Sequence, residues 1–157
     1  MSDIRTKAIE GLTRGASFTV SRTFTELDTI AFAEISRDDN PVHFDDRFAH
    51  AKNFHGRICH GLLVGSLLTE IGGQIGLLAS GMNFRFKKPV YFGDTVACCF
   101  TFTEVDDRNR AIGEAVFTNQ RNEIVIEASV TGILPGDSEK HVMRAMMEEG
   151  ALHKKCL

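Results

Sequence analysis

The chain has 157 residues, of which 43% are hydrophobic and 25% charged, a composition typical of one soluble domain rather than of a disordered or fibrous protein. Its formal net charge of -3 argues against the broad basic surface on which nucleic-acid binding depends, so a small-molecule substrate and no nucleic acid are expected. The four cysteines show no metal-binding or disulfide spacing, and charges at 1–14 interrupt any signal peptide. Free thiols in a cytoplasmic protein are therefore predicted.

The N-terminal part predicts a strand followed by a capped helix. Apolar and hydroxyl residues alternate over 16–24, which indicates a half-buried strand. Thr25 and Asp28 have the spacing of a capping box and predict a helix over 26–35. An irregular stretch follows, in which we expect one short helix over 45–51.

Residues 61–80 form an apolar run that is long enough to cross a membrane. Glu70, Gln74 and several glycines within the run, with strand-like segments around it, favour a helix buried in a soluble core instead. No membrane interaction is therefore expected. On an ideal helix one stripe collects Gly61, Gly65, Gly72 and Gly76, with Thr69 beside it. Such a stripe allows close approach either by a sheet or by a substrate chain, and the pattern leaves both interpretations open.

The residue pattern in the second half of the chain predicts an antiparallel sheet followed by a tail. Strands are expected over 82–91, 95–105, 111–119 and 124–134. Because the turns between them are short, each strand is expected to pair with the next, and Cys98 and Cys99 to point to opposite faces. The fold class is thus α+β, with an antiparallel sheet curled around one hydrophobic helix.

The chain divides into one domain over 1–136 and an extension over 137–157. Helical spacing in the extension places four apolar residues on one face, namely Val142, Met143, Met146 and Met147. The extension could pack on a dimer, cover a site or stay mobile, and the sequence leaves these three possibilities open.

The segment with the clearest chemistry reads D-D-N-P-V-H over 38–43. Pro41 fixes its own φ and pushes Asn40 into an extended conformation, which makes a turn between Asp38 and His43. A carboxylate and an imidazole brought together by this turn can hold one water molecule, which is the minimum for adding water to an activated double bond or removing it. Taken alone, the motif is more often only a turn, since Asp, Asn and Pro all favour turns.

Two other groups of residues could bind ions. Histidines and aspartates are frequent over 43–60, but the ligand patterns of metal sites are absent, so no metal site is predicted. Basic side chains that could meet the phosphates of coenzyme A are Arg57, Arg85, Lys87 and Lys88. Strand alternation sends Lys88 to the face opposite Arg85 and Lys87, so part of this cluster is expected to be a solvated face.

Three blocks in order carry a resemblance to a known family. They are S-R-D-D-N-P-V-H (36–43), G-R-I-C-H-G-L-L (56–63) and F-K-K-P-V-Y-F-G-D-T-V (86–96). Together they resemble the MaoC-like hydratase family, notably the (R)-specific enoyl-CoA hydratases, over about 15–134. The resemblance implies a hot-dog fold, in which a strongly bent antiparallel sheet wraps a long central helix, and a homodimer in which two sheets join.

The resemblance also implies residue roles. Asp38 and His43 match the catalytic pair, and Asn40 shapes the turn between them. Gly61 matches the glycine whose backbone N–H contacts the thioester carbonyl, where a helix N-terminus is suited to stabilise an oxyanion. Thr69 either touches the acyl group or bonds a carbonyl one turn back.

The implied reaction is the (R)-specific hydration of trans-2-enoyl-CoA to (R)-3-hydroxyacyl-CoA, or the reverse dehydration. It needs no cofactor, and the acyl group rides on coenzyme A or on acyl carrier protein. Asp38 is favoured as the base and His43 as the proton donor, although sequence alone does not divide these roles. His60 is expected to hydrogen-bond the catalytic loop.

Two alternatives from other classes stay open. The first is a hot-dog acyl-CoA thioesterase that uses Glu70, although Glu70 would project about 180° from Gly61 on an ideal helix and leave Asp38 and His43 without a role. The second is a non-catalytic module that binds acyl thioesters. The presence of both Asp38 and His43 disfavours it.

Overall fold

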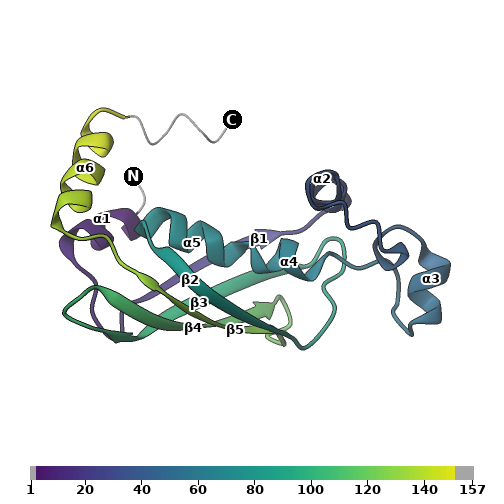
Figure 1. Cartoon of the computed structure of the whole chain (residues 1–157). Coiled ribbons are helices and arrows are strands. Elements are labelled where there is room, and N and C mark those ends of the chain that lie inside the picture. The colour runs from purple at the N-terminus through teal and green to yellow at the C-terminus, as the bar shows by residue number, and fades with distance from the viewer. Residues whose placement is uncertain (1–2, 151–157) are drawn as a thin grey trace.

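The computed structural model describes residues 3–150 and contains one antiparallel sheet wrapped around a helical segment (Figure 1). The strands are β1 (Ser17–Thr23), β2 (Leu78–Phe86), β3 (Thr95–Val105), β4 (Arg110–Asn119) and β5 (Ile124–Ile133). Their order in the sheet is β1-β3-β4-β5-β2, so β1 and β2 form its two edges. The α+β class predicted from sequence is confirmed.

The pairing of the strands differs in part from the sequence prediction. The hairpins β3–β4 and β4–β5 are present, but β2 pairs with β5 and not with β3. Pro89, in the segment after β2, has no N–H to donate to a ladder. Instead Val90 O accepts from Cys59 N at 2.8 Å, and Gly93 N donates to Phe24 O at 2.7 Å, which carries the chain across to the β1 edge.

The helical segment is shorter than predicted and is broken once. It consists of α4 (Gly61–Gly65) and α5 (Leu67–Ile75), separated by Ser66. The predicted continuation to residue 80 is wrong, because Gly76 adopts φ 80° and ends α5 with its N–H on Gly72 O at 2.9 Å. The strand β2 therefore begins at Leu78 rather than at residue 82.

The four glycines of the stripe differ in their structural surroundings. A Cβ on Gly61 would lie 2.6 Å from the ring of Phe86, and one on Gly65 would lie 3.0 Å from Phe84, so both glycines allow the helix to approach β2. Gly76 ends α5 with its left-handed turn. A Cβ on Gly72 would meet no atom within 4 Å. Tight packing on the sheet thus accounts for two of the four glycines.

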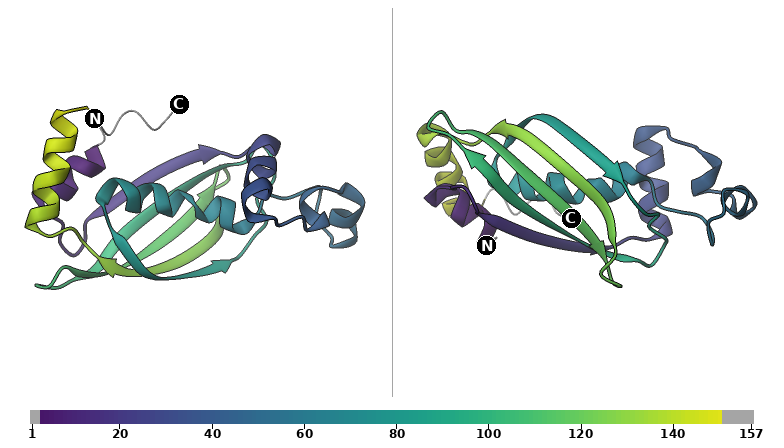
Figure 2. Two further views of the ribbon diagram at one scale, coloured as in Figure 1. Left: turned by 45° about the horizontal axis from the view of Figure 1, so that its top comes forward. Right: turned by 90° about the horizontal axis from the view of Figure 1, so that it is seen from below.

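One core lies between the helical segment and the sheet. Ile71 and Ile75 from α5 are fully buried there, together with phenylalanines from the sheet side. Cys98 belongs to this core and Cys99 is exposed, so their predicted opposite orientation is confirmed. Figure 2 shows α4 and α5 lying along the concave side of the sheet.

The segment between β1 and α4 projects beyond one end of the sheet (Figure 1). It contains α2 (Glu26–Ser36), the 3₁₀ turn η1 (Pro41–His43) and α3 (Asp46–Ala51). The predicted capping box is confirmed, since Thr25 N donates to the Asp28 carboxylate at 2.8 Å and Asp28 N donates to Thr25 Oγ1 at 3.3 Å.

Two more helices lie at the opposite end of the molecule (Figure 1). The helix α1 (Asp3–Glu10) was not predicted from the sequence, and its Ile4 and Ala8 join the core. The C-terminal extension is helical over α6 (Asp137–Glu148), where Met143 is buried against the Gly76 turn. Residues 151–157 of the extension lie outside the described part. Within 3–150, no helix combines the length and hydropathy needed to cross a membrane.

Candidate active site

A cavity of about 660 Å³ opens where the α2–η1 loop, the start of α4 and the end of β2 meet. Its lining is mostly apolar and includes Phe32, Val64 and Phe86. The polar residues Asp38, His43 and His60 also line the cavity. A largely apolar cleft with a few convergent polar groups is the usual form of a small-molecule site.

Asp38 reaches this cavity because α2 ends immediately before it. Arg37 adopts a left-handed conformation with φ 56°, and its N–H donates to Ala33 O at 2.7 Å, which closes the helix. The backbone N–H of Asn40 donates to Asp38 Oδ1 at 3.2 Å and fixes the carboxylate, so Oδ2 stays available. The Asp38 side chain is 49% exposed, which lets solvent reach it.

His43 is positioned by the turn that the sequence predicted. Val42 N donates to Asn40 Oδ1 at 3.2 Å, and Pro41 begins the 3₁₀ turn that carries His43. The His43 side chain is buried, with Nδ1 at 2.8 Å from Ile58 O. A carbonyl oxygen only accepts, so Nδ1 carries the proton, and in the neutral ring Nε2 holds a free lone pair.

The surroundings of His43 keep its imidazole neutral. Burial lowers the pKa of His43 below its ordinary value of 6.5, and the neighbouring His60 lowers this pKa further. The hydrogen bond to Ile58 and the charge of Asp38 oppose this shift without reversing it. At neutral pH His43 is therefore an acceptor at Nε2 and suited to take up a proton.

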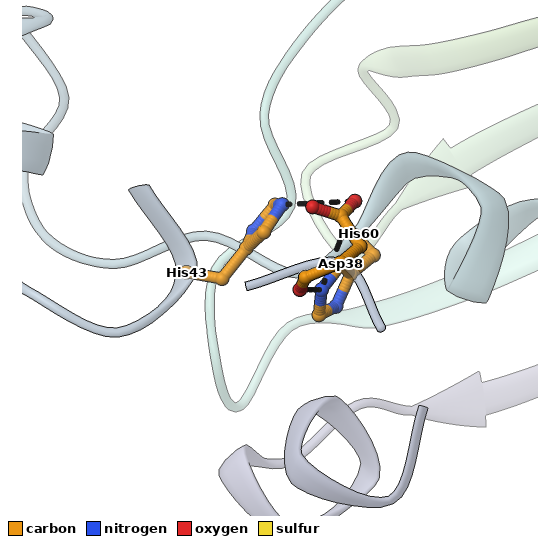
Figure 3. Close-up of side chains that lie close together, drawn as sticks. All are labelled: Asp38, His43 and His60. Atoms are coloured by element: carbon orange, nitrogen blue, oxygen red, sulfur yellow. Dashed lines mark hydrogen bonds and ion pairs between the residues drawn. The ribbon is translucent and has the colours of Figure 1, made fainter. Parts of the chain in front are cut away.

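Asp38 and His43 face each other across a short gap (Figure 3). Their Oδ2 and Nε2 atoms are 3.9 Å apart, too far for a direct hydrogen bond. One water oxygen can lie about 2.8 Å from both atoms and donate one hydrogen to each. The structure thus brings together the two residues that the sequence selected as an acid-base pair.

His60 supports both members of the pair. Its Nε2 donates to Asp38 O at 2.9 Å, which confirms the expected bond to the catalytic loop. Its ring packs against that of His43, with centroids 3.8 Å apart and planes tilted by 32°. His60 Nδ1 is buried and has no hydrogen-bond partner within the described residues.

Gly61 places a backbone donor beside the pair. It is the first residue of α4, after the N-cap His60, so its N–H has no acceptor within the helix. Gly61 also lines the cavity. A carbonyl oxygen of a bound substrate could accept from this N–H.

The other two predicted site residues lie elsewhere. Asn40 is not among the residues that line the cavity, and its side chain bonds Val42 N within the turn. Thr69 lies two turns beyond Gly61 and donates from Oγ1 to Ser66 O at 2.7 Å, the second of its two expected roles. It borders a different, smaller cavity. Conversely, sequence reasoning missed Ile58, whose carbonyl sets the His43 tautomer, because a backbone acceptor leaves no sequence signal.

The basic residues do not divide as strand alternation predicted, because β2 ends at Phe86, before Lys87 and Lys88. Lys87 and Lys88 both reach the cavity rim but lie beside different acidic partners, Glu127 at 3.2 Å and Glu123 at 2.7 Å. Arg57 pairs with Glu26. Of the four basic residues, only Lys87 and Lys88 line the cavity, so they are the two that a substrate entering it would meet.

Two other chemistries fit the site poorly. Asp38, His43 and His60 each offer one ligand atom within 4.8 Å of the others, yet His43 Nδ1 is bonded to Ile58 O and His60 Nε2 to Asp38 O. Cys59 also lines the cavity, but burial raises the pKa of its thiol to about 12, so it is no nucleophile at neutral pH.

A helical segment wrapped by an antiparallel sheet in this way is the hot-dog fold, as solved structures of related proteins show. An (R)-hydratase from Aeromonas caviae involved in PHA biosynthesis matches with a TM-score of 0.74 and 30% identity, over 80% of this chain and 99% of that one. The R-hydratase PhaJ1 from Pseudomonas aeruginosa matches with a TM-score of 0.74 and 28% identity, over 81% of this chain and 84% of that one.

The chain belongs to the MaoC-like family: the family model described as "MaoC like domain" matches residues 11–143. It is 28% identical to the (R)-specific enoyl-CoA hydratase of Rhodospirillum rubrum, over 80% of this chain and 90% of the relative. It is 32% identical to the mitochondrial 3-hydroxyacyl-[acyl-carrier-protein] dehydratase of Arabidopsis thaliana, over 73% of each chain. The family resemblance, the hot-dog fold and the assignment to the hydro-lyases are thereby confirmed.

Proposed function

We propose that the protein catalyses (R)-specific hydration of trans-2-enoyl-CoA to (R)-3-hydroxyacyl-CoA, or the reverse dehydration. The observation that carries this proposal is the 3.9 Å gap between Asp38 Oδ2 and His43 Nε2, in a largely apolar cavity that also contains the Gly61 N–H. Relatives that are named hydratases and dehydratases of acyl thioesters support it.

In the hydration direction, Asp38 and His43 hold the water beside C3 of the enoyl group. His43 Nε2 takes one proton as the water oxygen attacks C3, while the O–H that remains on this oxygen donates a hydrogen bond to the Asp38 carboxylate, which also stabilises the imidazolium. This division differs from the sequence interpretation, in which Asp38 was the base. The lowered pKa of His43 and its Nδ1–H bond to Ile58 favour His43 as the base.

Attack at C3 moves electrons onto the thioester oxygen, where an enolate develops. The Gly61 N–H at the start of α4 stabilises this negative charge. The His43 imidazolium then returns its proton to C2, which completes the addition of H and OH. The same steps in reverse remove water from a 3-hydroxyacyl thioester.

The direct test is incubation of the purified protein with crotonyl-CoA, with three readouts: loss of the conjugated thioester absorbance, free thiol, and oxidation of the product by a (3R)-specific dehydrogenase. We expect loss of absorbance, a (3R) product and no free thiol. Release of thiol from saturated acyl-CoA would instead identify a thioesterase, although Glu70 is exposed and outside the cavity lining. Binding without turnover of coenzyme A or acyl-carrier-protein thioesters would identify a binding module.

We also propose the carrier, the compartment and the oligomeric state. The substrate carrier is coenzyme A or acyl carrier protein, whose phosphopantetheine thioester is the same, and the reaction uses no cofactor or metal. The protein acts in the cytoplasm. It acts as a homodimer.

The dimer is proposed to form along β2. This edge strand exposes the large apolar side chain of Leu78, and Met82 and Phe86 on its inner face are partly exposed, whereas the other edge strand, β1, exposes no large apolar side chain. We expect sedimentation velocity to give twice the chain mass, and Leu78→Asp to give one chain mass because Leu78 is 73% exposed on β2. The matched control is Leu27→Asp on α2, where Leu27 is 75% exposed. A dimer that survives Leu78→Asp, or a wild-type monomer, would contradict the β2 interface.

His60 is proposed as a positioning residue, and its role should appear in the pH profile. Because the pKa of His43 is lowered in the free protein, the kcat/KM of hydration should stay constant on acidification through pH 6.5 and fall only below it. Removing His60 removes one cause of this lowering, so the acidic limb should move to higher pH in both His60→Gln and His60→Phe. His60→Gln keeps a donor for Asp38 O, whereas His60→Phe keeps only the packed ring, and a lost hydrogen bond should lower kcat a further ~5- to 10-fold in the second variant. Unchanged limbs in both variants would show that His60 is merely structural.

A further inference from the structure

A second cavity, of about 110 Å³, lies between α5 and the sheet. Leu68, Thr69 and Gly72 border it from the helix, and Met82 and Val130 border it from the strands. None of these residues lines the cavity that holds Asp38 and His43. The small cavity is apolar, apart from Thr69, and has no part in the mechanism described above.

The sheet register places the two cavities along one face of the β2–β5 ladder. Three consecutive inward rungs of the β2–β5 ladder are Phe86–Ile126, Phe84–Ala128 and Met82–Val130. The first rung lines the large cavity and the last rung lines the small one. The middle rung therefore separates the two spaces.

Along α4 and α5 the two cavities follow one another in the same order. Gly61 borders the large cavity, Thr69 and Gly72 border the small one, and Gly65 lies between them. At Gly65 the gap between helix and sheet is filled by the ring of Phe84, which would lie 3.0 Å from a Cβ on that glycine. The Phe84 ring is also stacked on Phe86, with centroids 6.2 Å apart and planes 8° from parallel. The Phe84 ring thus fills the space between the helix and the sheet at a point between the two cavities. Figure 2 shows the helices and the sheet that border this space.

We propose that Phe84 is the end wall of the acyl-chain site and restricts the protein to short-chain 2-enoyl thioesters. This inference rests on the proposed function. A thioester carbonyl at the Gly61 N–H would direct its acyl chain along α4 toward Gly65, a rise of about 6 Å over four residues. A staggered carbon chain advances about 1.3 Å per bond, so it reaches Phe84 after about five carbons. Chains of four to six carbons fit, and longer chains need the Phe84 ring to leave its place.

The test is the ratio of kcat/KM for trans-2-decenoyl-CoA to that for crotonyl-CoA. The wild type should favour crotonyl-CoA by at least ~10-fold, since a misfit of a few methylenes against a wall is worth about 1–3 kcal/mol. Phe84→Ala should raise the ratio at least ~10-fold by joining the two cavities, and Phe84→Leu should raise it less. The matched control is Phe102→Leu, which truncates a buried phenylalanine that borders neither cavity and should leave the ratio unchanged.

A second substitution tests whether the small cavity receives the acyl chain. A side chain on Gly72 meets open space, so Leu at this helical position should fill the small cavity without distorting α5. We expect Gly72→Leu to cancel the gain of Phe84→Ala in the double variant. A gain that persists in the double variant would show that the chain takes another path, which would overturn the proposal.

Binding separates this inference from the proposed function. If the wild type hydrates no enoyl-CoA of any length, the proposed function fails, and calorimetric titration with butanoyl-CoA and decanoyl-CoA still tests the wall. Tighter binding of decanoyl-CoA by Phe84→Ala than by the wild type, relative to butanoyl-CoA, would support it. If the wild type turns over both lengths equally and Phe84→Ala leaves the ratio unchanged, the wall is refuted although the hydratase stands.

Discussion

Asp38→Asn and His43→Gln are each expected to lower the kcat of crotonyl-CoA hydration by at least ~100-fold, the typical contribution of a positioned acid or base. The amide in Asp38→Asn would keep the size of the carboxylate but lose the charge that holds water and stabilises the imidazolium. The amide in His43→Gln would keep a polar group but accept no proton at the position of Nε2. Because Asp38 and His43 act on one water, the double variant should lose little more than either single variant.

The chain offers matched controls for both substitutions. Asp39→Asn changes the adjacent carboxylate, which is exposed and outside the cavity lining, and His55→Gln changes an exposed histidine of the same projecting segment. Both controls should retain activity within about threefold, as expected for surface changes away from the chemistry. Full activity in Asp38→Asn or His43→Gln would remove the pair from the mechanism.

Local signals predicted the parts of the site that depend on neighbours in sequence. Thr25 and Asp28 fixed the start of α2, and the Asn-Pro turn brought Asp38 toward His43, because capping boxes and proline act over a few residues. The position of Gly61 at a helix start was readable for the same reason.

Features that depend on distant partners could not be predicted from the pattern. The residues at 61–80 are mostly apolar, so hydropathy gave no sign that Gly76 would turn left-handed and end α5. The pairing of β2 with β5 rather than β3 follows from a crossing segment, whose hydrogen bonds to Phe24 and Cys59 are long-range. The tautomer of His43 likewise depends on the carbonyl of Ile58, fifteen residues away.

The position of Gly61 allows its backbone N–H to be deleted without removing the helix. Proline is tolerated at the first position of a helix, and His60 before it has φ -61° and ψ 135°, a conformation that proline accepts in the preceding residue. Gly61→Pro therefore removes the proposed oxyanion donor, whereas Gly61→Ala keeps it. Both add bulk against Phe86, where a Cβ would lie 2.6 Å from the ring, so the pair should be compared in a Phe86→Ala background.

In that background we expect Gly61→Pro to have a kcat about 10²- to 10³-fold below that of Gly61→Ala, the loss typical of one oxyanion donor. The KM for crotonyl-CoA should change much less, since the N–H bonds the enolate of the transition state more strongly than the thioester of the ground state. Circular dichroism and thermal unfolding of both variants would show whether the helix and the fold persist. Equal kcat values in two folded variants would mean that the Gly61 N–H does not stabilise the enolate, and the oxyanion would then have to be bound by another group of the cavity.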